Sequence, residues 1–198
     1  MKVPINFIHV GWGTALLALS GINAGSAPKP DVRLFDFSQP DAVRPWRVVN
    51  DDVMGGVSTS QFLWKEGVAV FKGTVSLENN GGFASVRTQP GEHDLTGTDA
   101  FVIRVRGDGR RYKFTVRTEG RYNAALYQAS FETRQGEWQE IKLPFSQFTP
   151  TWRGRILRDV PPLDPAKVNS VGFLIADKQA GPFRLEIGWI RATRSNGE

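Results

Sequence analysis

The chain has 198 residues, which suits a single domain with an adequate core and a short appendage. It contains no cysteine, and this excludes disulfides, thiolate metal sites and a cysteine nucleophile. The net charge is +5, but the lysines and arginines are scattered and form no run, so we expect no nucleic-acid partner.

The N-terminal segment has the order of a secretory signal peptide. Met1 and Lys2 precede an apolar stretch from Ile5 to Leu19, and small residues follow from Ala24 to Ala27. This order predicts a signal peptide over residues 1–27, a linker over 28–32 and a folded domain over 33–194. The expected location is therefore outside the cytoplasm, in a periplasm. The alternative is an uncleaved N-terminus that anchors the chain in a membrane, although the apolar stretch is short for a span. We expect no transmembrane span once the signal is removed.

The remainder of the chain is typical of short strands at regular spacing. In 101–106, Phe101, Ile103 and Val105 share one face and Arg104 and Arg106 the other. The 21 glycines and 12 prolines supply frequent turns. Strands are predicted over 34–37, 58–64, 68–77, 82–88, 101–106, 112–117, 125–133, 138–143, 171–175 and 183–190. A hairpin turn is predicted at 65–67, an irregular loop over 147–162 and one helical turn within 163–168. The pattern predicts an all-β fold, an antiparallel β-sandwich of jelly-roll type.

The segment from Asn50 to Ser58 places two adjacent carboxylates, Asp51 and Asp52, beside a glycine pair. Two neighbouring carboxylates cannot both be buried without donors, a cation or water. A calcium site at Asp51 and Asp52 is one interpretation, although a two-acid loop has few ligands. The favoured interpretation is that one of them accepts backbone N–H bonds or pairs with an arginine such as Arg87.

Polar side chains on the outer faces of the strands form the first candidate binding surface. Across the turn at 107–109, the predicted strands 101–106 and 112–117 would be neighbours, and their outer residues would project from one sheet. This arrangement would bring Arg104, Arg117 and Gln128 together as a platform for a sugar, a carboxylate-bearing ligand or a peptide. The alternative is the ordinary solvated face of an antiparallel sheet. The residues of this face are Arg104, Arg106, Lys113, Arg117, Gln128 and Ser130.

A second candidate is Trp152-Arg153-Gly154-Arg155, because two arginines beside an aromatic on a loop suit recognition. The favoured interpretation is an internal charge cluster, in which Trp152 closes the edge of the sandwich while Arg153 and Arg155 pair with Asp51, Asp52 or Asp177. Among the other tryptophans, Trp46, Trp138 and Trp189 are expected in the core.

Catalytic arrangements are hard to build from this sequence. A Ser-His-Asp triad would have to use His93, in a turn beside Asp94, and no nucleophile elbow accompanies any serine. No spacing selects a pair of carboxylates for glycoside hydrolysis, and no phosphate-binding loop is present. We therefore expect neither an enzyme nor a cofactor.

An ordered set of motifs resembles the complex I intermediate-associated protein 30 family. The resemblance implies a galactose-binding-domain-like β-sandwich, a fold that carbohydrate-binding modules also use. It further implies a chaperone or assembly factor of NADH:ubiquinone oxidoreductase (complex I). The expected function is therefore a non-enzymatic domain that binds a protein partner, such as subunits of a membrane complex. The alternative is a module for a carbohydrate or a small polar ligand. The motifs are Asn50–Ser58 after Trp46, Gly82–Arg87, Tyr127–Phe131, Pro144–Phe148 after Trp138, Trp152–Arg155, Gly172–Gln179 and Gly181–Leu185.

Overall fold

The computed structural model describes Met1, residues 31–119 and residues 124–194. The predicted signal peptide and most of the linker lie outside the described residues. Among the described residues the regular elements are strands and five short 3-10 helices, without an α-helix. No helix in these ranges is long and apolar enough to cross a bilayer.

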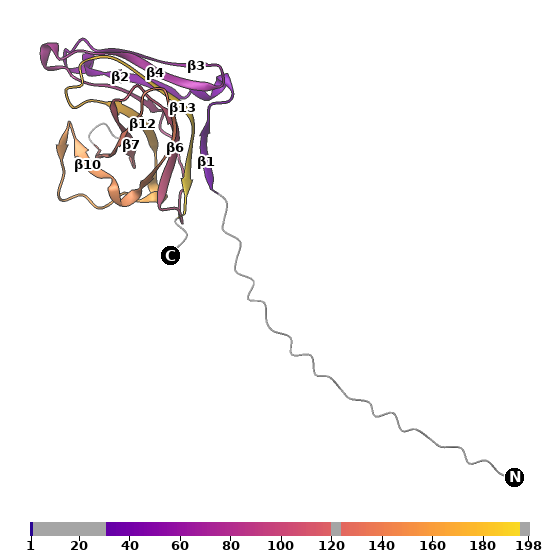
Figure 1. Cartoon of the computed structure of the whole chain (residues 1–198). Helices are drawn as coiled ribbons and strands as arrows, with labels where there is room; N and C mark the ends of the chain where they lie inside the picture. Colours follow the sequence, from indigo (N-terminus) through magenta and orange to yellow (C-terminus); the bar gives the residue numbers. More distant parts are fainter. Residues whose placement is uncertain (2–30, 120–123, 195–198) are drawn as a thin grey trace.

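The strands form two antiparallel sheets, so the all-β sandwich predicted from the sequence is confirmed (Figure 1). Sheet A has the order β3-β4-β13-β6-β9, and β1 also pairs with β13. Its strands are β1 (Val32–Asp36), β3 (Thr59–Lys65), β4 (Val68–Val75), β6 (Ala100–Arg106), β9 (Trp138–Pro144) and β13 (Gly181–Thr193).

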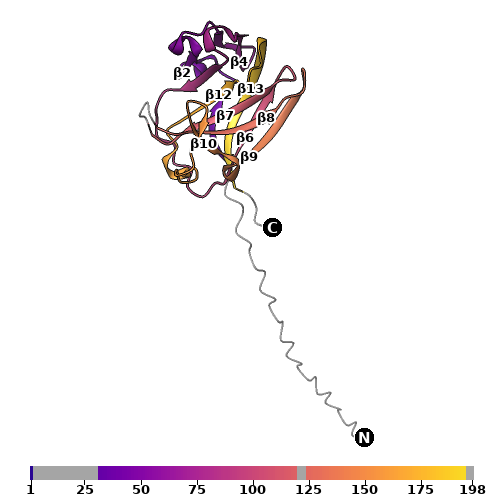
Figure 2. The same ribbon diagram turned by 90° about the vertical axis from the view of Figure 1, so that its left-hand side faces the viewer.

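Sheet B has the order β11-β10-β8-β7-β12-β5-β2. Figure 2 shows β2 towards the top and β10 towards the bottom of the sandwich, in agreement with this order. Its strands are β2 (Trp46–Asn50), β5 (Ala84–Thr88), β7 (Arg111–Arg117), β8 (Leu126–Glu132), β10 (Thr149–Trp152), β11 (Arg155–Ile156) and β12 (Ser170–Ile175). The 3-10 helices are η1 (Pro40–Val43), η2 (Asp51–Met54), η3 (Glu78–Asn80), η4 (Phe145–Gln147) and η5 (Pro165–Lys167).

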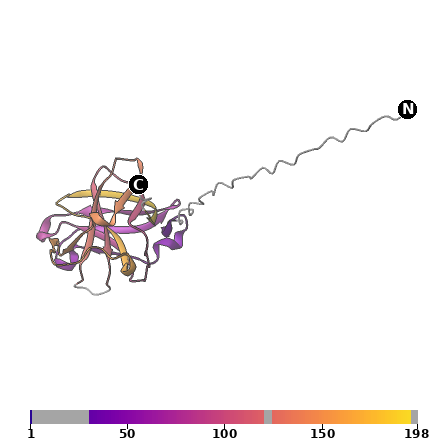
Figure 3. The ribbon, with the colours of Figure 1, turned by 90° about the horizontal axis from the view of Figure 1, so that it is seen from below.

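The hydrophobic core lies between the two sheets. Figure 3 shows the strands that enclose it, seen from below. The alternating strands bury one face each, as their sequences predict. Phe101 from sheet A meets Phe114 from sheet B edge to face, with ring centroids 5.0 Å apart, and Phe114 in turn contacts Phe173. Both faces of the sandwich therefore remain free to carry polar side chains.

Two connections differ from the sequence prediction. β6 and β7 are not partners across the turn at 107–109, because β6 pairs with β13 and β9 whereas β7 pairs with β8 and β12. The chain crosses there from sheet A to sheet B. The predicted irregular loop over 147–162 contains the β10–β11 hairpin, whose turn residues Arg153 and Gly154 have φ of 47° and 77°. The positive φ at both positions is the geometry of a two-residue hairpin turn.

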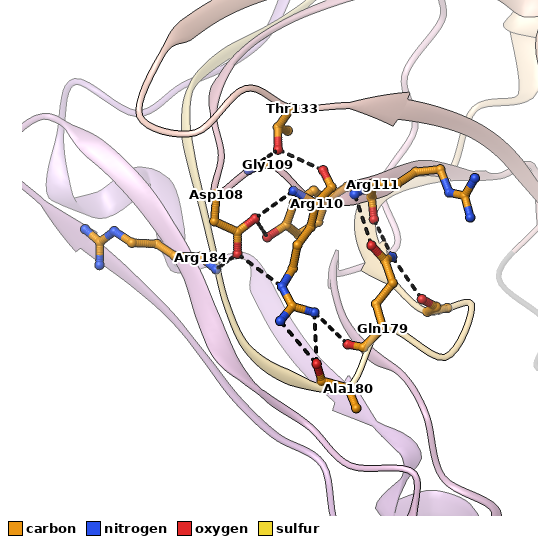
Figure 4. Close-up of polar contacts among 10 residues, drawn as sticks. Asp108, Gly109, Arg110, Arg111, Thr133, Gln179, Ala180 and Arg184 are labelled. Carbon is orange, nitrogen blue, oxygen red and sulfur yellow. Dashed lines mark hydrogen bonds and ion pairs between the residues drawn. The ribbon is translucent and has the colours of Figure 1, made fainter.

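Polar contacts fix the crossover between the sheets to the connection between β12 and β13 (Figure 4). Arg110 donates from Nη1 to the carbonyl of Gln179 at 2.8 Å, and the Gln179 amide exchanges hydrogen bonds with the backbone of Arg111. Asp108 accepts the backbone N–H of Arg184 at 2.9 Å. The start of β13 is therefore held at a fixed place relative to β6.

Candidate functional site

The turn after β2 is organised around one buried carboxylate. Asp51 is 0% exposed and begins η2. Its Oδ1 accepts the backbone N–H of Ser58 at 2.9 Å, and its Oδ2 accepts the Ser58 hydroxyl at 2.5 Å and the N–H groups of Gly82 and Phe83 at 2.7 and 3.2 Å. Burial raises the pKa of Asp51, but these donors outweigh it and the pKa is lowered. Asp51 thus joins its own turn to the loop before β5.

Two glycines allow the loops to approach this carboxylate. A Cβ atom on Gly81 would lie 2.6 Å from Asp51 Oδ2, and a Cβ on Gly56 would overlap the same side chain. Gly55 ends η2 in the left-handed region, with φ of 88°. Within the pair Gly55-Gly56, Gly56 therefore allows close packing against Asp51, and Gly55 allows the chain to reverse.

Asp52 does not join this network. It is exposed, and its side chain has no polar partner among the described residues. Because four donors occupy the oxygens of Asp51, that carboxylate has little capacity left to ligate calcium. No three His, Asp or Glu side chains gather as a metal-binding set in the ranges 31–119 and 124–194.

The predicted charge cluster between this turn and the Trp152 loop is wrong. The turn follows β2, whereas Trp152 to Arg155 form the end of the β10–β11 hairpin at the opposite edge of sheet B. Within the described part of the chain, neither Arg153 nor Arg155 forms an ion pair. The Cζ atom of Arg153 instead lies over the Trp152 ring, 4.8 Å from the ring centroid. Trp152 is 38% exposed.

The predicted polar platform is divided between the two sheets. Arg117 and Gln128 lie on neighbouring strands of sheet B, as predicted, but Arg104 lies on β6 of sheet A and faces the other side of the sandwich. Gln128 donates to Thr151 Oγ1 at 2.8 Å and so joins β8 to β10. Arg117 donates to the carbonyl of Ala124 at 3.2 Å. These two side chains therefore stabilise local structure.

The outer face of sheet A carries a groove that the sequence did not predict. It has a volume of about 570 Å³ and is lined by Arg104, Arg106 and Trp138, together with Arg184 and Glu186 of β13. Their separation in the sequence concealed the site, because sheet topology alone brings them together. The tryptophan prediction needs correction as well: Trp46 is in the core at 4% exposure, but Trp138 and Trp189 line this outer groove.

His93 is placed for packing. Its backbone pairs with Val168, and its ring meets Phe35 edge to face at 6.0 Å between centroids. Burial lowers the pKa of His93.

Known structures share the fold of this chain. A family 11 carbohydrate-binding module of a cellulosomal cellulase from Clostridium thermocellum aligns with a TM-score of 0.65 at 15% identity, over 85% of this chain and 97% of the module. An agarase aligns with a TM-score of 0.60 at 12% identity, over 86% of this chain and 25% of the agarase. At such identities the likeness concerns the fold alone.

Curated relatives are similar in sequence as well. The chain is 32% identical over 180 residues to "Complex I intermediate-associated protein 30, mitochondrial" of Drosophila melanogaster, covering 79% of this chain and 61% of that protein. It is 31% identical over 179 residues to the mouse protein of the same name, covering 79% of this chain and 54% of that protein. The chain thus spans little more than half the length of these relatives.

These relatives contradict the predicted export to a periplasm, because their names assign them to mitochondria. A family model described as "Complex I intermediate-associated protein 30 (CIA30)" matches residues 35–187, which include nearly all strands of both sheets. The match confirms the resemblance seen in the motifs, and the chain belongs to the complex I intermediate-associated protein 30 family.

Proposed function

We propose that this chain is a non-enzymatic protein-binding domain that acts in the assembly of respiratory complex I. Family membership and the names of the curated relatives support this proposal. Because the chain covers little more than half of these relatives, the proposal concerns the domain they share with it.

The observation that carries the proposal is an apolar surface around the Asp51 turn. Val53, Met54 and Val57 are 62%, 56% and 47% exposed, and Leu77 on the adjoining loop is 45% exposed. We call these four residues the turn surface. Clustered exposed apolar side chains are typical of protein-binding sites.

The turn surface is preorganised. The buried carboxylate of Asp51 binds both Ser58 and Gly82, so the two loops that carry the apolar residues are joined before any partner arrives. A rigid apolar surface loses less conformational entropy on binding than a flexible one. The network around Asp51 therefore has a use beyond the stability of the turn.

Carbohydrate binding is less well supported. Sugars are commonly bound on exposed aromatic faces, but Trp138, Trp152 and Trp189 each have an arginine over the ring. The likeness to carbohydrate-binding modules is limited to the fold.

The test is affinity capture of complex I subunits from detergent extracts of mitochondrial membranes. The double variant Val53→Ser/Met54→Ser should capture markedly less than the unchanged chain, since its apolar contact area is reduced. The matched control is Ile156→Ser, which removes an equally exposed apolar side chain from β11. Equal capture by the double variant and the unchanged chain would contradict the proposal. Loss of capture in Ile156→Ser alone would move the contact to the β10–β11 hairpin and reject the turn surface.

A further inference from the structure

The groove on the outer face of sheet A gathers three guanidinium groups around one buried carboxylate. Arg104 and Arg106 extend from β6, and Arg184 and Glu186 extend from β13, which pairs with it. Glu186 is 6% exposed, whereas the side chains of the three arginines are 41–45% exposed. The cations therefore line the opening and the anion lies beneath them. We call this set the arginine groove.

Glu186 orients the guanidinium groups of Arg106 and Arg184, and each of them binds Glu186 through its Nε and Nη2 atoms. Arg106 donates from Nε to Oε2 at 2.6 Å and also from Nη2, while Arg184 donates from Nε and Nη2 to Oε1 at 2.9 and 2.7 Å. Burial raises the pKa of Glu186, but the bonds from Arg184 and Arg106 outweigh it and lower the pKa. Each guanidinium keeps its Nη1 group unused, because neither Nη1 has a partner among the described residues.

Trp138 restrains the two arginines of β6. The Cζ atoms of Arg104 and Arg106 lie 5.3 and 5.1 Å from the centre of its ring. The other contact of Arg104 is a long ion pair of 3.8 Å with the exposed Glu140, which has little energetic weight. Arg104 therefore keeps most of its donors available while its position is fixed.

The floor of the groove is kept open at Gly188, which lies at the irregularity in the β13–β6 register between Ile187 and Trp189. A Cβ atom there would lie 3.4 Å from Cδ of Arg104 and 3.7 Å from the Trp138 ring, so a longer side chain would occupy the groove. Arg184 also borders a neighbouring depression of about 430 Å³ that contains Lys72 and Gln61. This depression offers room for the remainder of a ligand.

We propose that the arginine groove binds a phosphate group. The other carboxylates that line the groove have cations of their own, since Asp36 pairs with Arg33 and Glu66 with Lys65. The three guanidiniums then face the two carboxylates of Glu186 and Glu140, which leaves one positive charge at the opening. Their unused N–H groups come from three side chains, and a phosphate ester offers up to three terminal oxygens where a carboxylate offers two. The phosphate belongs either to a soluble ester or to a lipid headgroup, and the chemistry of recognition is the same.

The binding test is a titration of the folded chain with glycerol phosphate at constant ionic strength, followed by NMR at the indole N–H of Trp138. We expect a saturable shift, and Arg104→Gln should weaken binding about tenfold or more, because it removes a charged donor. The matched control is Arg191→Gln, which removes an arginine that lies over Trp189 but does not line the groove. The control should bind like the unchanged chain.

A second variant keeps the test decisive if a single substitution beneath the groove disturbs folding. Arg106→Gln/Glu186→Gln removes one cation together with the buried anion and should also weaken binding, since Arg184 loses its orienting partner. The proposal fails if no saturable shift occurs, or if Arg104→Gln and the double variant bind as tightly as the unchanged chain.

Vesicles distinguish the two sources of phosphate. Co-sedimentation with phosphatidylglycerol vesicles but not phosphatidylcholine vesicles, lost in Arg104→Gln, would assign a lipid headgroup. Binding of glycerol phosphate without co-sedimentation would assign a soluble ester. Groove variants leave the turn surface intact, so capture of complex I subunits reports separately on the proposed function.

Discussion

Asp51→Asn is the most informative perturbation of the fold. The substitution preserves the shape of the side chain, but it replaces one carboxylate oxygen by an NH₂ group. In the unchanged chain the backbone nitrogen of Ser58 lies 2.9 Å from Oδ1 of Asp51. If the amide oxygen of the variant takes the place of Oδ2, its NH₂ group faces this backbone N–H. One buried donor then loses its acceptor, and three others exchange a charged acceptor for a neutral one.

The expected loss of stability follows from these four contacts. A buried donor without a partner costs about 1–3 kcal/mol, and a bond to a charged group is stronger than a neutral one by about 1 kcal/mol. The lower cost of burying a neutral amide offsets part of this sum. The net loss should be about 3 kcal/mol, which corresponds to a fall in Tm of roughly 6–12 °C for a domain of this size.

The pH dependence gives an independent check. The native pKa of Asp51 is lowered from its ordinary value of 3.8, so between the two values the unfolded chain binds more protons than the native one. The stability that Asp51 supplies is therefore complete above pH 3.8 and is lost as the pH falls towards the native pKa. The difference in stability between the unchanged chain and Asp51→Asn should narrow in acid.

The assay is urea unfolding followed by circular dichroism, at neutral pH and again in acid. The control is Asp52→Asn, which changes the exposed neighbouring carboxylate and should alter stability by less than about 0.5 kcal/mol. Equal unfolding midpoints for the two variants at neutral pH would refute the role assigned to the Asp51 network.

Three further substitutions probe other close contacts of the fold. Gly81→Ala should lower Tm by several degrees, because the new Cβ would lie 2.9 Å from the carbonyl oxygen of Glu78 and would also press against the buried Asp51 carboxylate. The control is Gly91→Ala, whose Cβ would lie 3.9 Å from the nearest atom and which should leave Tm unchanged. Equal melting of the two would contradict the packing argument. Tyr112→Phe removes a 2.9 Å hydrogen bond and should cost about 1 kcal/mol in urea unfolding at neutral pH. Burial raises the pKa of Tyr112 above 10, so the unchanged chain, but not the variant, should also lose stability through this group as the pH rises past 10. Glu186→Gln should lower the free energy of unfolding by about 2 kcal/mol at neutral pH. Because the native pKa of Glu186 is lowered, the difference in stability between the unchanged chain and the variant should narrow below pH 4.5. A difference that does not depend on pH would exclude an ionised Glu186 bound to the two arginines.

The sequence predicted which face is buried in the alternating strands β6, β7 and β8, because alternation depends on the strand alone. It could not predict which sheet a strand joins. Gly107-Asp108-Gly109 has the composition of a hairpin turn, but Asp108 binds the start of β13 and Arg110 binds the β12–β13 connection, and these contacts direct the chain across the sandwich. That choice depends on residues about 70 positions away.

The same limit applies to the candidate sites. The carboxylate pair at Asp51 and Asp52 was visible in the sequence, and the favoured interpretation, backbone N–H donors to one of them, agrees with the structure. The donors from Gly82 and Phe83 lie more than 30 residues away and carry no local signal. The arginine groove was missed because Arg106 and Glu186 are 80 residues apart and meet only through strand pairing.

The two buried carboxylates of this fold differ in what surrounds them, and the difference bears on function. Asp51 is neutralised by dipoles, since its donors are backbone N–H groups and a hydroxyl, and it leaves no net positive charge beside it. The surface it supports is correspondingly apolar, with Val53 and Met54 exposed. Glu186 is neutralised by two cations, so its pairing leaves a positive charge at the surface. The apolar surface around Asp51 is therefore suited to bind a protein. The positively charged surface around Glu186 is suited to bind an anion. If both proposals hold, substitutions in one surface should leave binding at the other unchanged, because no residue is common to the two sets.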